Sequence, residues 1–271
     1  MDEIIKAVIL GIVEGITEFL PISSTGHLIL VNQFIAFSEP FTKKFDVIIQ
    51  LGAIFSVVVY FRKRLFPMDR GRGSFFQTEA YIVWKKIIVG VIPAIIIGAL
   101  FYKKIENLLF NPTTVAVALV LGGVAIIILE SWNKQATIKS MGSLGYSTAF
   151  FIGLIQCLSM IPGTSRSAAT IIGAMVLGCS RLVAVEFSFF LAIPTIFAAT
   201  VYSIYKMGLS ITNSEIIVLI VGFVVSFFTA WLVVAGLMSF ISKRNFKPFG
   251  YYRILLGGVI LLYFLLQRYN G

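Results

Sequence analysis

Long apolar runs separated by short polar breaks extend along almost the whole chain. Several of these runs approach the roughly 20 residues that an α-helix needs to cross a bilayer. The hydrophobic pattern therefore predicts six transmembrane helices, which lie near 45–61, 84–102, 112–130, 182–205, 215–242 and 248–268.

Four shorter apolar runs occur as two pairs, and each pair is interrupted by a break that is rich in proline and hydroxyl residues. The breaks are Pro-Ile-Ser-Ser-Thr at 21–25 and Pro-Gly-Thr-Ser-Arg at 162–166. A helix that stops at membrane depth leaves backbone groups unpaired unless they line a cavity inside the protein. We therefore expect two re-entrant helical hairpins, formed by the runs 4–19 and 24–37 and by the runs 146–161 and 166–179.

The second half of the chain repeats features of the first. Phe-Asn-Pro at 110–112 and Leu-Gly-Gly-Val at 121–124 recur in the same order as Phe-Lys-Pro at 246–248 and Leu-Gly-Gly-Val at 256–259. A duplication joined within the polar stretch 131–145 explains this order. Each half then holds one hairpin and three spans, and an odd number of crossings places the halves in opposite orientations.

The predicted fold class is therefore an all-α polytopic membrane protein, an inverted-topology repeat with six transmembrane helices and two re-entrant helical hairpins. We expect a single membrane domain over 1–271, with repeat halves at about 1–140 and 141–271. In such repeats the two hairpin tips meet near the middle of the membrane, where they face one cavity.

Composition supports a membrane protein and excludes a nucleic-acid binder. The chain is 58% hydrophobic and 13% charged, with a mean hydropathy of +0.96, which is too apolar for a soluble domain. Its net charge of +10 comes from lysines and arginines in short clusters between apolar runs, with no basic face. Membrane lipids, and no nucleic acid, are the expected partners.

The basic clusters predict an orientation. Residues 62–64, 85–86 and 243–244 fall on one side of the membrane if the run 45–61 ends toward the cytoplasm. Because basic residues favour the cytoplasmic side, both termini and the mouth of the first hairpin are expected outside.

Two carboxylates lie in the first hairpin. Glu14 and Glu18 are four residues apart in an otherwise apolar run, so both project from one face of a helix. Such a pair can share a proton or bind a divalent cation. We expect Glu14 and Glu18 to form a metal site, and a structural ion-pair network is the alternative.

Hydroxyls and an imidazole follow the first break. Ser23, Ser24 and Thr25 come at the expected start of a second helix, where unpaired N–H groups favour an anion. His27, the single histidine of the chain, lies within one turn of them. These groups indicate phosphate chemistry, although His27 can alternatively cap a backbone carbonyl.

Arg166 is the corresponding candidate in the second hairpin. It follows Ser165 at the expected start of the returning helix, and a guanidinium there suits a phosphate. An arginine paired with Glu14 or Glu18 is the alternative, and both interpretations can hold together.

Other polar residues within apolar runs receive weaker assignments. Gln50 is a candidate for substrate binding, whereas Asp46 and Glu186 either line the cavity or join helices. Arg253 falls inside a predicted span, where an arginine is costly enough to be a functional candidate. Its role stays open, as do those of Asp46 and Glu186.

The sequence resembles a known family at these same motifs. Residues 14–27, Glu-Gly-Ile-Thr-Glu-Phe-Leu-Pro-Ile-Ser-Ser-Thr-Gly-His, resemble the first signature of the bacterial undecaprenyl-diphosphate phosphatases, also called bacitracin-resistance proteins. Pro-Gly-Thr-Ser-Arg-Ser at 162–167 resembles the second signature. The similarity continues at 45–52 and 186–194.

This resemblance implies an enzyme that hydrolyses undecaprenyl diphosphate, a polyprenyl diphosphate lipid, to undecaprenyl phosphate and inorganic phosphate. The reaction recycles the lipid carrier for cell-wall synthesis and gives bacitracin resistance. It implies a multi-pass protein of the bacterial cytoplasmic membrane with an external active site that depends on a divalent cation, Mg²⁺ or Ca²⁺. A homodimer stays open.

The resemblance also assigns functional positions, namely Glu14, Glu18, Ser24, Thr25, His27, Ser165 and Arg166. We expect Ser24 to attack the terminal phosphorus while His27 accepts and returns a proton. Arg166 and a cation on the two glutamates would neutralise the diphosphate. Direct attack by water, with Ser24 only orienting the phosphate, is the alternative.

A histidine-dependent lipid phosphatase and a transporter are the two alternative functions. A lipid phosphatase with a histidine nucleophile requires two histidines, and this chain has one. An inverted-repeat transporter or polyprenyl-phosphate translocase fits the expected architecture, and fold alone does not exclude it.

Overall fold

The protein is helical throughout the part that the structure describes. This computed structural model describes residues 2–67, 78–132, 135–208 and 211–270. Residues 133–134, within the expected join of the two halves, lie outside this set. Among the described residues, the β pairing is confined to an isolated parallel bridge between Ile138 and Cys179. The predicted all-α class is confirmed.

Each apolar run predicted from the sequence contains a helix. The long runs form α3 (Glu39–Tyr60), α5 (Glu79–Leu109), α6 (Pro112–Ser131), α9 (Arg181–Met207), α10 (Asn213–Ile241) and α11 (Lys247–Asn270). The short runs form α1 (Glu3–Thr17), α2 (Ser24–Ile35), α7 (Tyr146–Gln156) with its 3₁₀ extension η2 (Cys157–Met160), and α8 (Arg166–Val176). A single turn, α4 (Arg62–Leu65), follows α3.

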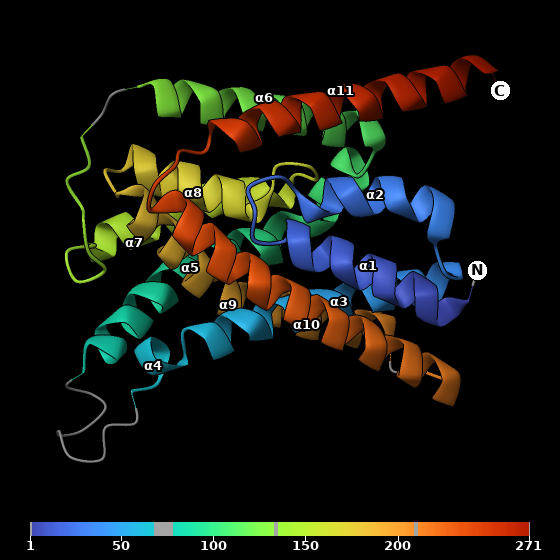
Figure 1. Ribbon diagram of the computed structural model, residues 1–271, viewed down its shortest axis with the longest axis horizontal. Coiled ribbons are helices and arrows are strands. Elements are labelled where there is room, and N and C mark those ends of the chain that lie inside the picture. The colour runs from blue at the N-terminus through green and yellow to red at the C-terminus, as the bar shows by residue number, and fades with distance from the viewer. Residues whose placement is uncertain (1, 68–77, 133–134, 209–210, 271) are drawn as a thin grey trace.

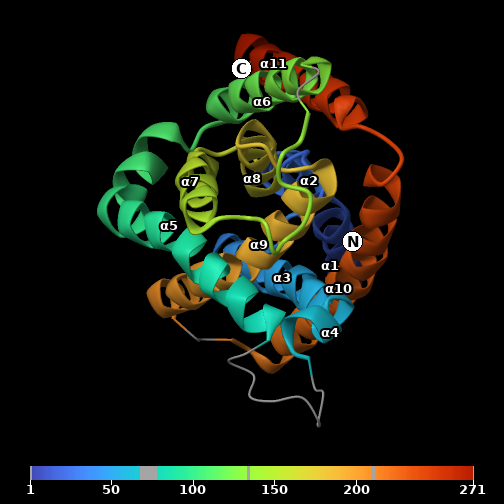
Figure 2. The same ribbon diagram turned by 90° about the vertical axis from the view of Figure 1, so that its left-hand side faces the viewer.

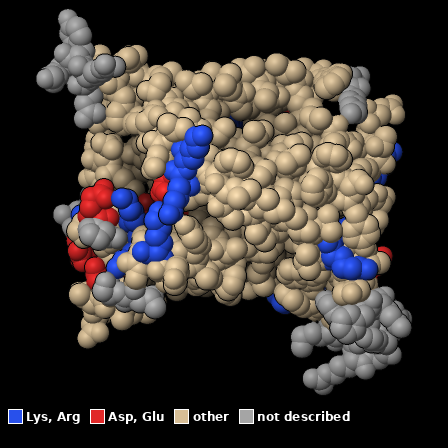
Figure 3. Space-filling view, turned by 180° about the vertical axis from the view of Figure 1, so that it is seen from behind, with Lys and Arg blue, Asp and Glu red and all other residues tan. Residues whose placement is uncertain are grey.

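Five of these helices, α5, α6, α9, α10 and α11, are long and apolar enough to cross a membrane. Helix α3 differs because its first two turns carry Glu39, Lys43, Lys44 and Asp46, which shorten its apolar part. On the face drawn in Figure 3, charged side chains gather toward the two ends and leave an uncharged band between them. These features indicate a multi-pass membrane protein.

Helix α9 lies at the centre of the molecule. It is the most buried of the five membrane-length helices, and Phe187, Phe189 and Phe190 on it are almost inaccessible to solvent. Figures 1 and 2 both show α6 and α11 side by side along one edge, and Figure 2 shows α5 and α10 on opposite flanks. The four short helices α1, α2, α7 and α8 lie between these layers.

The halves of the chain are interleaved. Helix α1 of the first half packs against α10 of the second, and α7 of the second packs against α5 of the first. Glycines permit both approaches: a Cβ at Gly11 would lie 2.8 Å from the carbonyl of Gly222, and a Cβ at Gly153 would collide with the carbonyl of Gly90. Glycines therefore let α1 and α7 each pack closely against a long helix from the other part of the chain.

The two breaks share an unusual backbone conformation. Ser23 precedes α2 with φ 72°, and Ser165 precedes α8 with φ 69°. Residues other than glycine rarely adopt a positive φ, and such residues concentrate at functional sites. Each serine also caps its helix, because its Oγ accepts a hydrogen bond from the N–H three residues later, that of Gly26 at 3.3 Å and that of Ala168 at 3.2 Å.

A buried carboxylate joins three helices at one end of the molecule. Arg181 Nε, at the start of α9, donates to both carboxylate oxygens of Glu130 on α6, at 2.9 and 3.0 Å. The backbone N–H of Phe246, just before α11, donates to the same carboxylate at 2.9 Å. This interaction fixes where α6, α9 and α11 meet.

Candidate active site

Glu18 and Ser24 form a hydrogen-bonded pair across the first break. Glu18 directly follows the last residue of α1, and Ser24 is the first residue of α2. Both are buried, and Ser24 Oγ donates to Glu18 Oε2 at 2.8 Å. A serine hydroxyl held on a carboxylate is the arrangement in which a general base activates a nucleophile.

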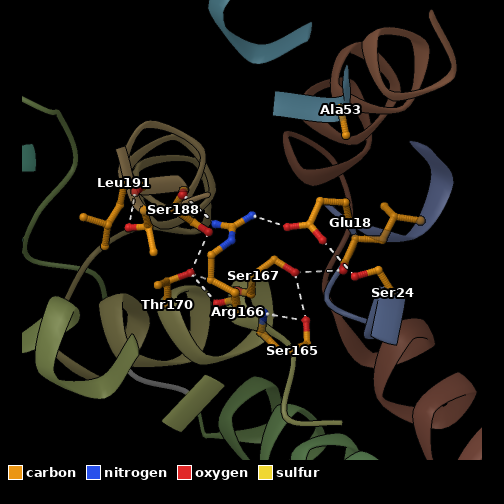
Figure 4. Close-up of polar contacts among 12 residues, drawn as sticks. Glu18, Ser24, Ala53, Ser165, Arg166, Ser167, Thr170, Ser188 and Leu191 are labelled. Atoms are coloured by element: carbon orange, nitrogen blue, oxygen red, sulfur yellow. Dashed lines mark hydrogen bonds and ion pairs between the residues drawn. The ribbon is translucent and has the colours of Figure 1, made fainter. Parts of the chain in front are cut away.

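Arg166 lies on the other side of the same carboxylate. Its Nη2 donates to Glu18 Oε1 at 3.3 Å, and its Nη1 donates to the carbonyl of Ser188 at 2.9 Å. Figure 4 shows the Glu18 carboxylate between the Arg166 guanidinium and the Ser24 hydroxyl. The arginine–glutamate pairing that the sequence left as an alternative is therefore present, and the two hairpins meet at Glu18.

Hydroxyl groups next to Arg166 form hydrogen bonds that connect the second break to the first break and to α9. Ser167 Oγ donates to the carbonyl of Leu20 in the first break at 2.9 Å, and it lies 3.0 Å from Ser165 Oγ. Thr170 Oγ1 lies 2.6 Å from Ser188 Oγ on α9. Ser188 was missed in the sequence analysis, although it is a polar residue among the phenylalanines at 187, 189 and 190.

His27 does not contact Ser24 in the way that the sequence suggested. Its Nδ1 lies 2.7 Å from the carbonyl of Ser23, and its Nε2 lies 2.7 Å from the hydroxyl of Tyr252 on α11. Because a carbonyl only accepts, Nδ1 donates and Nε2 of the neutral ring accepts the Tyr252 hydroxyl. In this structure the Ser24 hydroxyl contacts Glu18 and not His27, and the role of His27 as proton acceptor stays a prediction.

Tyr252 is a second residue that sequence reasoning missed. Its ring stacks on His27, with centroids 5.6 Å apart and planes within 5°. Sequence spacing gave no signal for it, because the contact depends on how α11 packs beside α6 and α2. The alternative in which His27 caps a backbone carbonyl is present, through Ser23.

Glu14 is the residue that best fits a bound cation. Its side chain is 0% exposed, and neither carboxylate oxygen has a hydrogen-bond partner among the described residues. Within the same part of the chain, no group of three or more histidine, cysteine, aspartate and glutamate side chains is arranged to hold a metal ion. A divalent cation on Glu14 would therefore complete its coordination with water and phosphate oxygens, as Mg²⁺ commonly does.

The remaining substrate-binding candidates are two serines, a threonine and a glutamine. Ser23 and Ser165 are the helix-capping serines of the two breaks. Thr25 lies in the first turn of α2 and Gln50 in the middle of α3, and both are partly buried. Their substrate-binding roles stay predictions.

Asp46 and Glu186 have different partners. Asp46 Oδ2 on α3 accepts a hydrogen bond from Asn32 Nδ2 at 3.3 Å, which joins α3 to α2. Glu186 forms an ion pair with Arg64 and so joins α9 to α4. Both side chains connect helices.

Comparison with known proteins finds one family model and several relatives that match nearly the whole chain. Residues 7–259 match the family model described as bacitracin resistance protein BacA. The undecaprenyl-diphosphatase of Lachnoclostridium phytofermentans is 50% identical over 270 residues, which cover 98% of each chain. Undecaprenyl-diphosphatase 1 of Clostridioides difficile is 50% identical over 266 residues, or 97% of each chain. The undecaprenyl-diphosphatase of Acetivibrio thermocellus is 46% identical over 272 residues, or 99% of this chain and 100% of its own.

The motifs around Glu18, Ser24 and Arg166 lie inside the matched region, and the relatives cover the chain from end to end. This chain belongs to the bacitracin resistance protein BacA family.

Proposed function

We propose that this protein is an undecaprenyl-diphosphate phosphatase that releases inorganic phosphate and leaves undecaprenyl phosphate in the membrane. The names of its relatives support this activity. The observation that carries it is the Glu18 carboxylate, which holds the Ser24 hydroxyl on one oxygen and the Arg166 guanidinium on the other. In this role the protein recycles the lipid carrier for cell-wall synthesis and gives bacitracin resistance.

Ser24 is the proposed nucleophile and Glu18 its base. Ser24 Oγ forms a bond to the terminal phosphorus while the bond from that phosphorus to the bridging oxygen breaks, so undecaprenyl phosphate leaves. Glu18 takes the hydroxyl proton and passes it to the leaving undecaprenyl phosphate. It then takes a proton from the water that attacks the phosphoserine, and returns it to Ser24 Oγ as the bond from Oγ to phosphorus breaks and inorganic phosphate leaves. The hydrogen bond of 2.8 Å already places this proton between the two groups.

Arg166 is the proposed phosphate clamp. Its Nε is buried and has no hydrogen-bond partner among the described residues, so this donor is free for a phosphate oxygen. When the diphosphate takes a share of the guanidinium, Glu18 loses part of its ion pair and is freer to take the proton of the Ser24 hydroxyl. Arg166 would thus couple substrate binding to activation of Ser24.

Glu14, with Glu18, is proposed to hold the divalent cation. Glu14 is the better placed of the two because both of its oxygens are free, whereas those of Glu18 are engaged. When bound, the cation would neutralise charge that gathers on the transferring phosphoryl group.

The proposed architecture has six membrane spans, α3 among them, and two re-entrant hairpins in an inverted repeat. It is supported by the matching glycine approaches, by the paired serine conformations, and by α1 and α7 lying toward opposite ends in Figure 1. The basic residues of α4 favour a cytoplasmic location for that end, which places the mouth of the first hairpin outside.

The test is phosphate release from undecaprenyl diphosphate by purified protein in detergent. Glu18→Gln should lower kcat by about 10²–10⁴-fold, the usual contribution of a general base. Glu39→Gln is the matched control, because Glu39 is an exposed glutamate that pairs with Lys43. Absence of phosphate release by the wild-type protein with added Mg²⁺ or Ca²⁺ would refute the activity.

The nucleophile can be tested separately. Acid quenching during turnover should trap a phosphate on the peptide that contains Ser24, and Ser24→Ala should abolish it. Wild-type turnover with no trapped phosphopeptide, together with substantial turnover of Ser24→Ala, would favour direct attack by water.

A further inference from the structure

Arg253 is an arginine in the second turn of α11 that no catalytic step uses. Its side chain is completely buried, and it has no carboxylate partner among the described residues. Instead, five backbone carbonyls accept its N–H groups: Leu119 at 3.2 Å, Pro21 at 3.2 Å, and Ala118, Gly163 and Thr164 at 3.1 Å each. A buried cation is costly unless its donors are satisfied, and here carbonyls alone satisfy them.

These five carbonyls belong to three segments that are far apart in sequence. Pro21 lies in the first break, Gly163 and Thr164 lie in the second, and the other two belong to α6. Carbonyls at a helix interruption have no partner within their own helix. A single planar guanidinium therefore supplies donors to both breaks at once.

The neighbouring helix is shaped to admit this guanidinium. A Cβ at Gly122 on α6 would collide with Arg253 Nη2 and would lie 2.8 Å from its Cζ. Gly258 belongs to the later Gly-Gly pair of the chain, on α11, and a Cβ at Gly258 would meet open space. Gly122 thus makes room for a specific side chain.

The contacts of Arg253 lie close to the reacting groups on both sides. Pro21 is three residues before Ser24, and Thr164 is two residues before Arg166. The Arg166–Glu18 contact of 3.3 Å joins groups from different hairpins, so it depends on how the two breaks are held relative to one another. Arg253 touches both breaks and none of the reacting groups.

We infer that Arg253 is a positioning residue that holds the two hairpin breaks in register, so that Arg166 on one break reaches Glu18 and Ser24 on the other. This inference rests on the proposed phosphatase activity. Loss of the guanidinium fork leaves the residues of the site present but misaligned, and a misplacement of about 1 Å can cost about 10²-fold in rate.

The experiment compares Arg253→Lys with Arg62→Lys in phosphate release, each with its thermal unfolding midpoint in detergent. An ammonium on a flexible chain cannot donate to three separate segments, so kcat of Arg253→Lys should fall about 100-fold. KM should change less than about threefold, because Arg253 does not touch substrate. Arg62→Lys replaces an exposed arginine of α4, outside the site, and should keep turnover within about twofold of wild type.

A double-mutant cycle with Arg166→Lys separates positioning from general loss of structure. If Arg253 acts by placing Arg166, Arg253→Lys should cost less than about threefold further in the Arg166→Lys background. The same loss in both backgrounds, or turnover of Arg253→Lys within about threefold of wild type, would overturn the inference.

A second pair of variants keeps the inference falsifiable if Arg253→Lys fails to fold. Gly122→Ala leaves the arginine in place but displaces its guanidinium, and it should lower kcat, whereas Gly258→Ala should not. Equal activity of these two variants would contradict the inference. An inactive wild-type protein would instead refute the phosphatase activity on which it rests.

Discussion

Ser24 Oγ and Glu18 Oε2 lie 2.8 Å apart although a proline-containing break separates the two residues along the chain. The carboxylate that follows α1 and the hydroxyl that begins α2 are brought together because the chain reverses between them. The other oxygen of Glu18 contacts Arg166, so one side chain joins the proposed nucleophile from the first break to the proposed phosphate clamp from the second.

Arg166→Lys should lower kcat by at least about 10²–10³-fold, comparable to the loss of a preorganised donor in other active sites. A lysine cannot contact Glu18, the Ser188 carbonyl and a phosphate oxygen in one plane as the guanidinium can. Phosphate release measures the effect, and an unchanged elution volume in size-exclusion chromatography serves as the folding control. Near-normal turnover would remove Arg166 from the site.

Glu14→Gln should depress turnover, and a chelator should have the same effect on the wild-type protein. Glu14 carries two buried oxygens without partners, so a neutral amide there weakens cation binding while keeping the size of the side chain. Titration of Mg²⁺ or Ca²⁺ into chelator-treated protein should need a higher cation concentration in the variant. Full wild-type activity in chelator without added metal would contradict a cation role for this pair.

Tyr252→Phe should lower kcat about fivefold while leaving the His27–Ser23 contact in place. The change removes the Tyr252 hydroxyl from His27 Nε2, and a neutral hydrogen bond contributes about 1 kcal/mol. Tyr251→Phe is the matched control, since Tyr251 is an exposed neighbour. Indistinguishable kinetics of the two variants would show that the reaction does not depend on how Tyr252 orients His27.

A cysteine at Ser38 should be labelled from outside the cell. Ser38 is exposed between α2 and α3, at the mouth of the first hairpin. The background should lack Cys157 and Cys179, the two native cysteines. A membrane-impermeant thiol reagent should then label intact cells, whereas labelling confined to inverted vesicles would reverse the proposed orientation.

The helices and breaks were predictable because hydrophobic length and proline position act locally. The proximity of Arg166 to the glutamates could also be expected, since symmetry-related tips share one cavity. The hydrogen bond between Ser24 and Glu18 could not be predicted, because it depends on the backbone conformation just before Ser24, where φ of Ser23 is positive. The contact between Tyr252 and His27 depends on the packing of α11 beside α6, which the sequence does not specify locally.

The packing of α1 against α10 has a consequence for biosynthesis. Residues Glu3–Thr17 are made long before their packing surface on Asn213–Ile241. During synthesis, Glu14 and Glu18 therefore lack their final packing partners on α10 until α10 has left the ribosome. Chains that stop before residue 213 should insert as helices yet lack a complete site, so activity becomes a property of the finished polypeptide rather than of either repeat.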